Sequence, residues 1–180
     1  FVCKEIGVPP KPTSNYSLGN EYNNDQIKQQ LDLMGLNYKA IDDVGECAAN
    51  LVAEDKIVAW FQGRDEFGPR ALGARSILAN PRKPEMKQIL NHKIKFREGF
   101  RPFCPSVLEE DVMKHFIGKK PTSRYMTINY EVKEAELMPS ISHVNKTARI
   151  QTVSQNSNAL FYNYLKRLKE KIGVGVSINT

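Results

Sequence analysis

One segment holds all of the net positive charge of this 180-residue chain. Residues 61–101 contain ten Lys or Arg side chains against four Asp or Glu, a net of +6, which equals the net charge of the whole chain. The segment opens with FQGRDEFGPRALGARS at residues 61–76, where glycines are interleaved with charged residues. Glycines permit tight turns and let the backbone approach a ligand closely, so this Arg/Gly run predicts a loop that binds an anion.

Three arginines of the Arg/Gly run, Arg64, Arg70 and Arg75, are spaced six and five residues apart. A guanidinium presents a planar fork of donors that fits a phosphate or a carboxylate. Each charge-assisted hydrogen bond contributes roughly 1.5–3 kcal/mol, and association costs about 4–15 kcal/mol, so an apolar pocket must also contribute. The alternative is that these arginines pair with Asp65, Glu66 or other acids and brace the fold.

Composition places the chain among soluble globular proteins, with 41 % hydrophobic and 26 % charged residues. Its length suits one domain with a hydrophobic core. No stretch approaches the roughly 18 apolar residues of a membrane helix, and the start lacks the features of a signal peptide. The three cysteines are far apart without a CxxC pair, which argues against a disulfide framework or a zinc site and predicts a cytoplasmic protein. Because the first residue is not Met, we expect a fragment of a longer protein.

Apolar periodicity predicts a mixed α/β or α+β domain. Residues 1–22 contain three prolines and no apolar period, so we expect a lead-in segment there and the domain over residues 23–180. Helices are expected over residues 24–35, 44–52, 84–94 and 161–173, a buried strand over 57–61, a half-buried strand over 124–132, and a last strand over 174–178.

A second basic segment, KIKFREGFRPF at residues 93–103, interleaves cations with phenylalanines. Such a pattern can stack a base and bind its phosphates. The alternative is a helix end with a solvated basic face and three core phenylalanines. A third segment, residues 142–152, places His143, Thr147, Arg149 and Gln151 at alternating positions, as on one face of a strand. A structural role for His143 is the alternative there. The common phosphate-loop, dinucleotide and zinc-protease signatures are absent.

Residues 60–79, WFQGRDEFGPRALGARSILA, closely resemble the signature of the O-carbamoyltransferase family, whose members carbamoylate nodulation factors and antibiotics. The resemblance continues over residues 94–108, resumes at 143–153 and ends at 179–180, so it covers nearly the whole chain. In that family the matching region is the C-terminal domain, which has a YrdC-like fold. The resemblance therefore implies a twisted mixed β-sheet with flanking helices.

The resemblance also implies a reaction. The domain would bind ATP with Mg²⁺ and carbamoyl phosphate, and carbamate from carbamoyl phosphate would attack the ATP α-phosphate to give carbamoyl-adenylate and pyrophosphate. The carbamoyl group would then pass to a hydroxyl of an acceptor in a separate N-terminal domain that carries its own metal. That domain is the expected partner, so this chain would not complete the transfer alone. Formation of a homodimer remains an open alternative, and nucleic acid is not an expected ligand.

Site residues carried over from the family fall into two sets, and no metal ligand is expected in this domain. The set expected to act in catalysis is Arg64, Arg70 and Arg97. The set expected to bind the nucleotide or carbamoyl phosphate is Arg64, Arg70, Ser76, Lys95, Arg97, Arg101, Arg149 and Asn179.

Two features depart from the family pattern. Asn145 and Lys146 stand where many relatives have Asp-Gly, and relatives continue past Thr180 with Ser-Phe-Asn. We therefore expect a C-terminally truncated domain whose closing strand is cut short. Two other functions remain as alternatives, a non-catalytic RNA-binding module and a fragment that only braces its partner domain.

Overall fold

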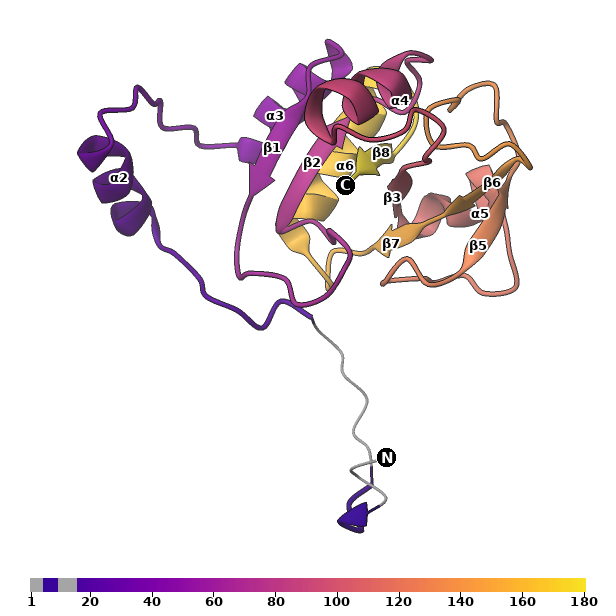
Figure 1. The fold of residues 1–180 in the computed structure, drawn as a ribbon, viewed down its shortest axis with the longest axis horizontal. Coiled ribbons are helices and arrows are strands. Elements are labelled where there is room, and N and C mark those ends of the chain that lie inside the picture. The colour runs from indigo at the N-terminus through magenta and orange to yellow at the C-terminus, as the bar shows by residue number, and fades with distance from the viewer. Residues whose placement is uncertain (1–4, 10–15) are drawn as a thin grey trace.

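Two β-sheets and the helices packed against them form the body of the computed structural model, which describes residues 5–9 and 16–180 (Figure 1). The elements are α2 (Asn24–Leu33), α3 (Val44–Ala53), β1 (Val58–Phe61), β2 (Arg75–Ala79), α4 (Met86–Ile89), the π-helix η1 (Leu90–Ile94), β3 (Cys104–Leu108), the 3₁₀-helix η2 (Glu109–Asp111), α5 (Val112–His115), β4 (Phe116–Ile117), β5 (Asn129–Val132), β6 (Thr147–Arg149), β7 (Gln151–Val153), α6 (Ala159–Ile172) and β8 (Val176–Asn179). Residues 1–4 and 10–15 of the predicted lead-in lie outside the described residues. In the described ranges, no helix combines the length and apolarity needed to cross a membrane.

The larger sheet has the strand order β1-β2-β8-β3-β7. Strands β3 and β7 are parallel and the other pairs are antiparallel, so the predicted mixed sheet is confirmed. The last strand of the chain lies in the middle of this sheet, where Asn179 is opposite Leu78 of β2 on one side and Cys104 of β3 on the other. The ends of the two basic segments are thereby brought to either side of one buried strand.

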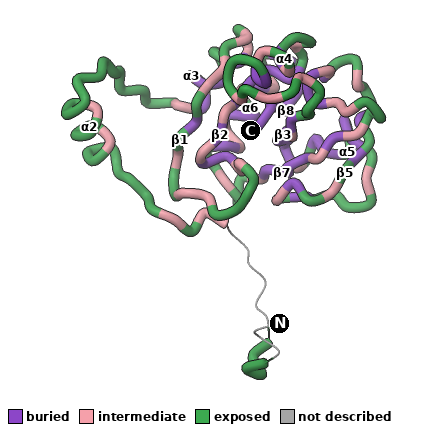
Figure 2. The backbone as a smooth tube through the Cα atoms, in the orientation of Figure 1, coloured by how far each residue is buried: buried purple, intermediate pink, exposed green. Residues whose placement is uncertain are grey.

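Helices α3 and α6 pack on each other and cover one face of the larger sheet through contacts with β1, β3 and β8. Five apolar positions of α6 that repeat at three and four residues are buried: Phe161, Tyr164, Leu165, Leu168 and Ile172. Figure 2 shows buried backbone along the strands of the larger sheet, in contrast to α2. The ring of Trp60 lies 6.0 Å from that of Phe161 and 5.7 Å from that of Tyr164. The helix ends at Gly173, which adopts the left-handed conformation, as the sequence predicts.

The smaller sheet is antiparallel, with the order β4-β5-β6. Strand β6 belongs to this sheet and β7 to the larger one, with only the buried Ile150 between them. The prediction of one continuous strand face over residues 142–152 is therefore wrong, because the chain changes sheets at Ile150. The strand predicted over 124–132 is also too long, because Met126 takes a left-handed backbone conformation (φ 53°) and only residues 129–132 pair.

The helices predicted at residues 24–35 and 44–52 are confirmed, and each begins with a side-chain cap, from Asn23 and Asp43 respectively. Helix α2 buries no residue and stands apart from both sheets (Figure 1). The strand predicted at 57–61 forms, but Phe61 is 51 % exposed because it points to the opposite face of the sheet from its buried neighbour Trp60. The helix predicted over 84–94 is confirmed in part, since its second half widens into the π-helix η1.

Gly73 is required where the Arg/Gly run turns onto α6. Its φ is +98°, and a Cβ atom there would lie 2.3 Å from the Phe161 ring. Gly63 also has a positive φ, but nothing lies within 4 Å of the position that a Cβ atom would take there.

We predict that Gly73→Ala lowers the free energy of unfolding by roughly 2–4 kcal/mol, the sum of overpacking and backbone strain. Gly63→Ala, with strain alone, should cost about 1 kcal/mol. Urea denaturation measures both, and equal losses would contradict the packing argument.

His115, at the end of α5, is 2 % exposed. Its nearest carboxylate oxygen, Glu134 Oε2, lies 3.8 Å from Nδ1, beyond hydrogen-bond distance. Burial lowers the pKa of His115, Lys114 lowers it further, and Asp111 and Glu134 oppose the shift. The unfolded chain therefore takes up this proton more readily, and the stability present above about pH 6.5 is lost as the pH falls.

We predict that the urea midpoint of the wild-type chain falls between about pH 7 and pH 5. In His115→Leu, the same midpoint should fall less over that range, because the buried titrating group is gone. An unchanged slope in the variant would contradict the assignment of this pH dependence to His115.

Candidate functional site

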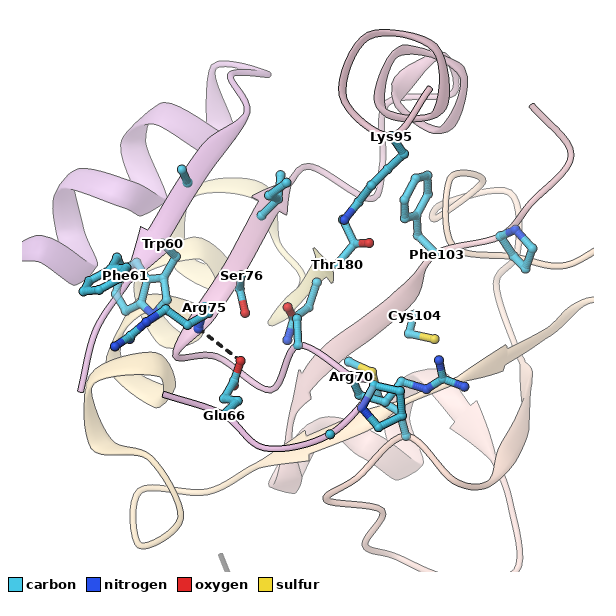
Figure 3. Close-up of a pocket in the computed structure, with 18 of the residues that line it drawn as sticks. Trp60, Phe61, Glu66, Arg70, Arg75, Ser76, Lys95, Phe103, Cys104 and Thr180 are labelled. Carbon is cyan, nitrogen blue, oxygen red and sulfur yellow. Dashed lines mark hydrogen bonds between the residues drawn. The ribbon is translucent and has the colours of Figure 1, made fainter. Parts of the chain in front are cut away.

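A cavity of about 710 Å³ lies where the Arg/Gly run, the second basic segment and the end of β8 meet (Figure 3). Its walls come from β1 and β2, from the loop at residues 66–71, from the segment following η1, and from the start of β3. The last two residues of the chain, Asn179 and Thr180, also line it. The cavity is thus assembled from segments that lie far apart in the sequence.

Glu66 gives the Arg/Gly run its shape. Its Oε1 accepts the backbone N–H groups of Leu72 (2.7 Å) and Ala74 (2.9 Å), and its Oε2 accepts that of Arg75 (3.1 Å). The Arg75 bond is visible in Figure 3. Burial raises the pKa of Glu66 above its usual value, although these three bonds favour the charged carboxylate. One side chain therefore closes the loop on which the cavity wall is built.

Arg75 braces the fold, as the alternative interpretation of the sequence predicted. Its guanidinium lies 2.6 Å from Asp65 Oδ1 and 3.5 Å from the centre of the Phe61 ring. It also donates to the backbone carbonyls of residues 62, 63 and 74. Because both terminal nitrogens of its guanidinium are used in this way, Arg75 shapes the rim of the cavity rather than presenting a free fork to a ligand, and only its Nε is left without a partner among the described residues.

Arg64 ties the preceding chain segment to the Arg/Gly run. It is exposed, and its Nε donates to the Gly19 carbonyl at 3.0 Å. Backbone hydrogen bonds join Gly19 and Asn20 to Asp65, and Tyr16 to Phe67. Arg64 does not line the cavity.

Four cations line the cavity, Arg70, Arg75, Lys95 and Arg97, and of these Arg75 is already paired within the fold. Lys95 points into it from the segment after η1 (Figure 3). Burial lowers the pKa of Lys95, and the neighbouring Arg97 charge lowers it further. Two cations brought together in a partly buried space repel each other, so an anion between them is favoured.

A strained turn carries Lys95 and Arg97. Phe96, between them, has φ 47°, which is rare for a bulky residue, and its ring is 83 % exposed. The Lys95 N–H donates to the Leu90 carbonyl at 2.9 Å, five residues back, which is the hydrogen bond of a π-helix. This local backbone geometry directs the two flanking cations to the cavity and the phenylalanine to solvent. Strain of this kind is concentrated at functional sites.

Asn91 holds Arg97 in place. Its side chain is fully buried, and its Oδ1 accepts the Arg97 Nε–H at 2.7 Å. Its Nδ2 donates to the carbonyls of Gly99 (3.2 Å) and Arg101 (3.0 Å), and its own carbonyl accepts the Arg97 N–H. The Arg97 guanidinium lies 4.8 Å from the centre of the Phe103 ring. One amide thus fixes both the loop and the guanidinium.

The Cys104 thiol marks the place where three positive charges converge. Burial raises the pKa of Cys104, and the charges of Arg149, Arg70 and Arg97 oppose that rise. Charges that favour a thiolate also favour a bound phosphate at the same place. Because Cys104 lines the cavity, these charges would favour an anion bound beside it.

A second cavity of about 590 Å³ adjoins the first. The two share Gly68, Pro69, Arg70 and Met126 in their walls, and Arg149 lines the second. Its apolar wall includes Tyr16 and Tyr125, whose rings meet edge to face at 4.6 Å. Arg70 is therefore the cation common to both spaces.

The structure brings most of the sequence-predicted site residues together. Those that line the first cavity are Arg70, Ser76, Lys95, Arg97 and Asn179. Arg149 lines the adjoining cavity, whereas Arg64 and Arg101 line neither, and Arg101 Nε lies 2.9 Å from Glu98 Oε2. Their roles in binding stay predictions.

Glu66, Asn91 and Cys104 were not predicted as site residues. Glu66 was considered only as an ion-pair partner, and a neutral Asn91 gives no signal in a charge pattern. Across the described ranges, no group of three or more His, Cys, Asp or Glu side chains is placed to hold a metal ion.

Residues 49–180 match the family model described as the carbamoyltransferase C-terminus. The chain is 41 % identical over 162 residues to nodulation protein NolNO of Sinorhizobium fredii, covering 86 % of this chain and 24 % of that protein. It is 40 % identical over 190 residues to nodulation protein NolO of Bradyrhizobium diazoefficiens, covering all of this chain and 34 % of that protein. The chain thus spans a quarter to a third of these relatives.

Among solved structures, full-length HypF in its phosphate- and nucleotide-bound form matches with a TM-score of 0.54 and 20 % identity. The match covers 81 % of this chain and 18 % of that one. At this identity the likeness is one of fold, and it confirms the predicted YrdC-like α/β architecture.

We predict that Arg97→Ala weakens pyrophosphate binding by roughly ten- to hundredfold, the worth of one charge-assisted hydrogen bond. Asn91→Ala should weaken it by a similar factor, because the guanidinium loses its support. The double variant should lose little more than either single variant. Calorimetric titration measures all three, with Lys166→Ala on the exposed side of α6 as a charge-matched control. Fully additive losses would show that Asn91 does not act through Arg97.

Proposed function

Since the chain belongs to the carbamoyltransferase C-terminal family, we propose that it forms carbamoyl-adenylate from ATP and carbamoyl phosphate. This would be the first half-reaction of an O-carbamoyltransferase. Transfer to a hydroxyl acceptor would require the remainder of the longer protein, because the chain spans only 24 % and 34 % of the two nodulation proteins. The observation that carries the proposal is the single cavity lined by Arg70, Lys95 and Arg97 together with Cys104.

The proposed reaction needs charge neutralisation and alignment more than covalent help from the protein. Water cleaves carbamoyl phosphate to carbamate and inorganic phosphate. A carbamate oxygen attacks the α-phosphorus of ATP, the bond from that phosphorus to its bridging oxygen breaks, and pyrophosphate leaves. Carbamate is already an anion, so no strong general base is required. Arg70, Lys95 and Arg97 would hold the reacting phosphates against their mutual repulsion.

Apolar surface in the same cavity supplies the binding that the cations alone do not. Ile77, Phe103 and the buried Trp60 line it beside the charged groups. A cavity with apolar walls and a few convergent polar groups is typical of small-molecule sites. This enclosure favours ATP over RNA as the ligand. The exposed Phe96 and Phe100 rings (83 % and 77 %) are what supports the RNA-binding alternative.

Mg²⁺ would be held mainly by the nucleotide phosphates. Among the described residues, Glu66 is the one Asp or Glu side chain that lines the cavity, and both of its oxygens already accept hydrogen bonds from backbone N–H groups. This donor set does not fit a protein-held magnesium site, which uses one or two carboxylates with the substrate phosphates. We therefore assign no step of the reaction to a metal ligand in this domain.

Pyrophosphate release from ATP tests the proposal. We expect release that depends on carbamoyl phosphate, and a fall of roughly tenfold or more in the rate for Arg70→Ala and Arg97→Ala, because each removes a charge from the cavity. Lys166→Ala should keep the wild-type rate. If the full-length protein releases no pyrophosphate with both substrates present, the proposed half-reaction is wrong.

A further inference from the structure

We propose that the side-chain oxygen of Asn179 selects carbamoyl phosphate by accepting a hydrogen bond from its amide N–H. The inference rests on the proposed function, since it takes the cavity to be the acyl-phosphate site. It adds the feature by which the cavity would distinguish a carbamoyl group from an acyl group of the same size and charge.

The Asn179 amide is buried and half satisfied. The residue is 2 % exposed and lines the cavity. Its Nδ2 donates to Ser106 Oγ and to Gln151 Oε1, both at 2.9 Å. Its Oδ1 has no hydrogen-bond partner among the described residues. Buried polar atoms are nearly always paired in native proteins, so an unpaired acceptor beside a cavity calls for a ligand donor.

A chain of hydrogen bonds fixes which way this amide faces. Gln151 Nε2 donates to the Leu72 carbonyl at 2.7 Å, which leaves Gln151 Oε1 as an acceptor toward Asn179. Ser106 Oγ donates its proton to that same Oε1 at 2.6 Å. Rotating the Asn179 amide would place its oxygen against Gln151 Oε1, two acceptors without a proton between them. The free position of Asn179 is therefore an acceptor and cannot become a donor.

The chain of bonds begins in the Arg/Gly run. Leu72 is also held there by Glu66, at 2.7 Å from its backbone N–H. Because Gln151 and Ser106 are 6 % and 0 % exposed, water does not compete for their bonds. Buried groups of the fold thus determine that Asn179 offers the cavity a hydrogen-bond acceptor. A ligand N–H is the partner that the fold leaves for Asn179 Oδ1.

The position of Asn179 favours the carbamoyl amide over the adenine amino group. Asn179 is directly opposite Cys104 in the β3–β8 register, and Cα atoms of opposite residues are about 4.5–5.5 Å apart. The charges of Arg70, Arg97 and Arg149 converge on Cys104. In carbamoyl phosphate only a carbon and an oxygen separate the amide nitrogen from phosphorus. In ATP, the ribose and the base separate the amino group from the α-phosphate.

Acetyl phosphate is the matched probe, because a methyl group replaces the amide and the phosphate is unchanged. We expect the wild-type chain to bind carbamoyl phosphate roughly ten- to hundredfold more tightly than acetyl phosphate, measured by calorimetric titration. In Asn179→Leu, which has similar size and no acceptor, this ratio should fall to near one. A general loss of structure would weaken both ligands together and leave the ratio unchanged.

The wild-type chain alone keeps the inference falsifiable if Asn179→Leu does not fold. Equal wild-type affinities for the two phosphates would overturn the inference and leave the proposed function standing. Binding of neither phosphate would overturn both. Titration with ATP and inosine triphosphate, which lacks the amino group, is the second comparison. If Asn179→Leu changes only the ATP to inosine triphosphate ratio, the acceptor serves the base and the inference is wrong.

Discussion

The insertion of β8 between β2 and β3 is the interaction on which the cavity depends. Asn179 pairs with Leu78 on one side and with Cys104 on the other, and every residue of β8 is buried. The Arg/Gly run ends at β2 and the second basic segment ends at β3. Pairing of one strand with both neighbours therefore sets the distance between two groups of cations that the sequence separates.

Buried polar side chains then give each group its shape. Glu66 closes the Arg/Gly run through three backbone N–H groups, and Asn91 binds both the loop carbonyls and the Arg97 guanidinium. Gln151 and Ser106 orient the Asn179 amide by accepting hydrogen bonds from its Nδ2. A charge-assisted hydrogen bond contributes only roughly 1.5–3 kcal/mol, so anion binding depends on holding several donors in position before the ligand arrives. These uncharged and acidic residues do that.

Local patterns in the sequence predicted the elements that short-range physics determines. The helix periodicity of α6 and its Gly173 stop, the capped starts of α2 and α3, and the strand preceding the Arg/Gly run are all features of neighbouring residues. The break at Ile150 and the position of β8 depend on which strand pairs with which, and periodicity does not carry that information. The clustering of charge pointed to Arg70, Lys95 and Arg97, which line the cavity. It did not distinguish them from Arg75, because the Asp65 carboxylate and the carbonyl groups that bind Arg75 come together only in the folded chain. No charge or motif in the sequence marked Asn91, because it holds the loop and Arg97 through hydrogen bonds that form only when the residue is buried in the fold.

Electron density for a bound nucleotide tests the central claim most directly. In crystals of the chain grown with ATP and carbamoyl phosphate, we expect phosphate density among Arg70, Lys95 and Arg97, beside Cys104. Density for the base should lie against the apolar wall that includes Ile77 and Phe103. Well-ordered nucleotide bound instead on the exposed Phe96 and Phe100 rings, with the cavity filled only by water, would contradict the account.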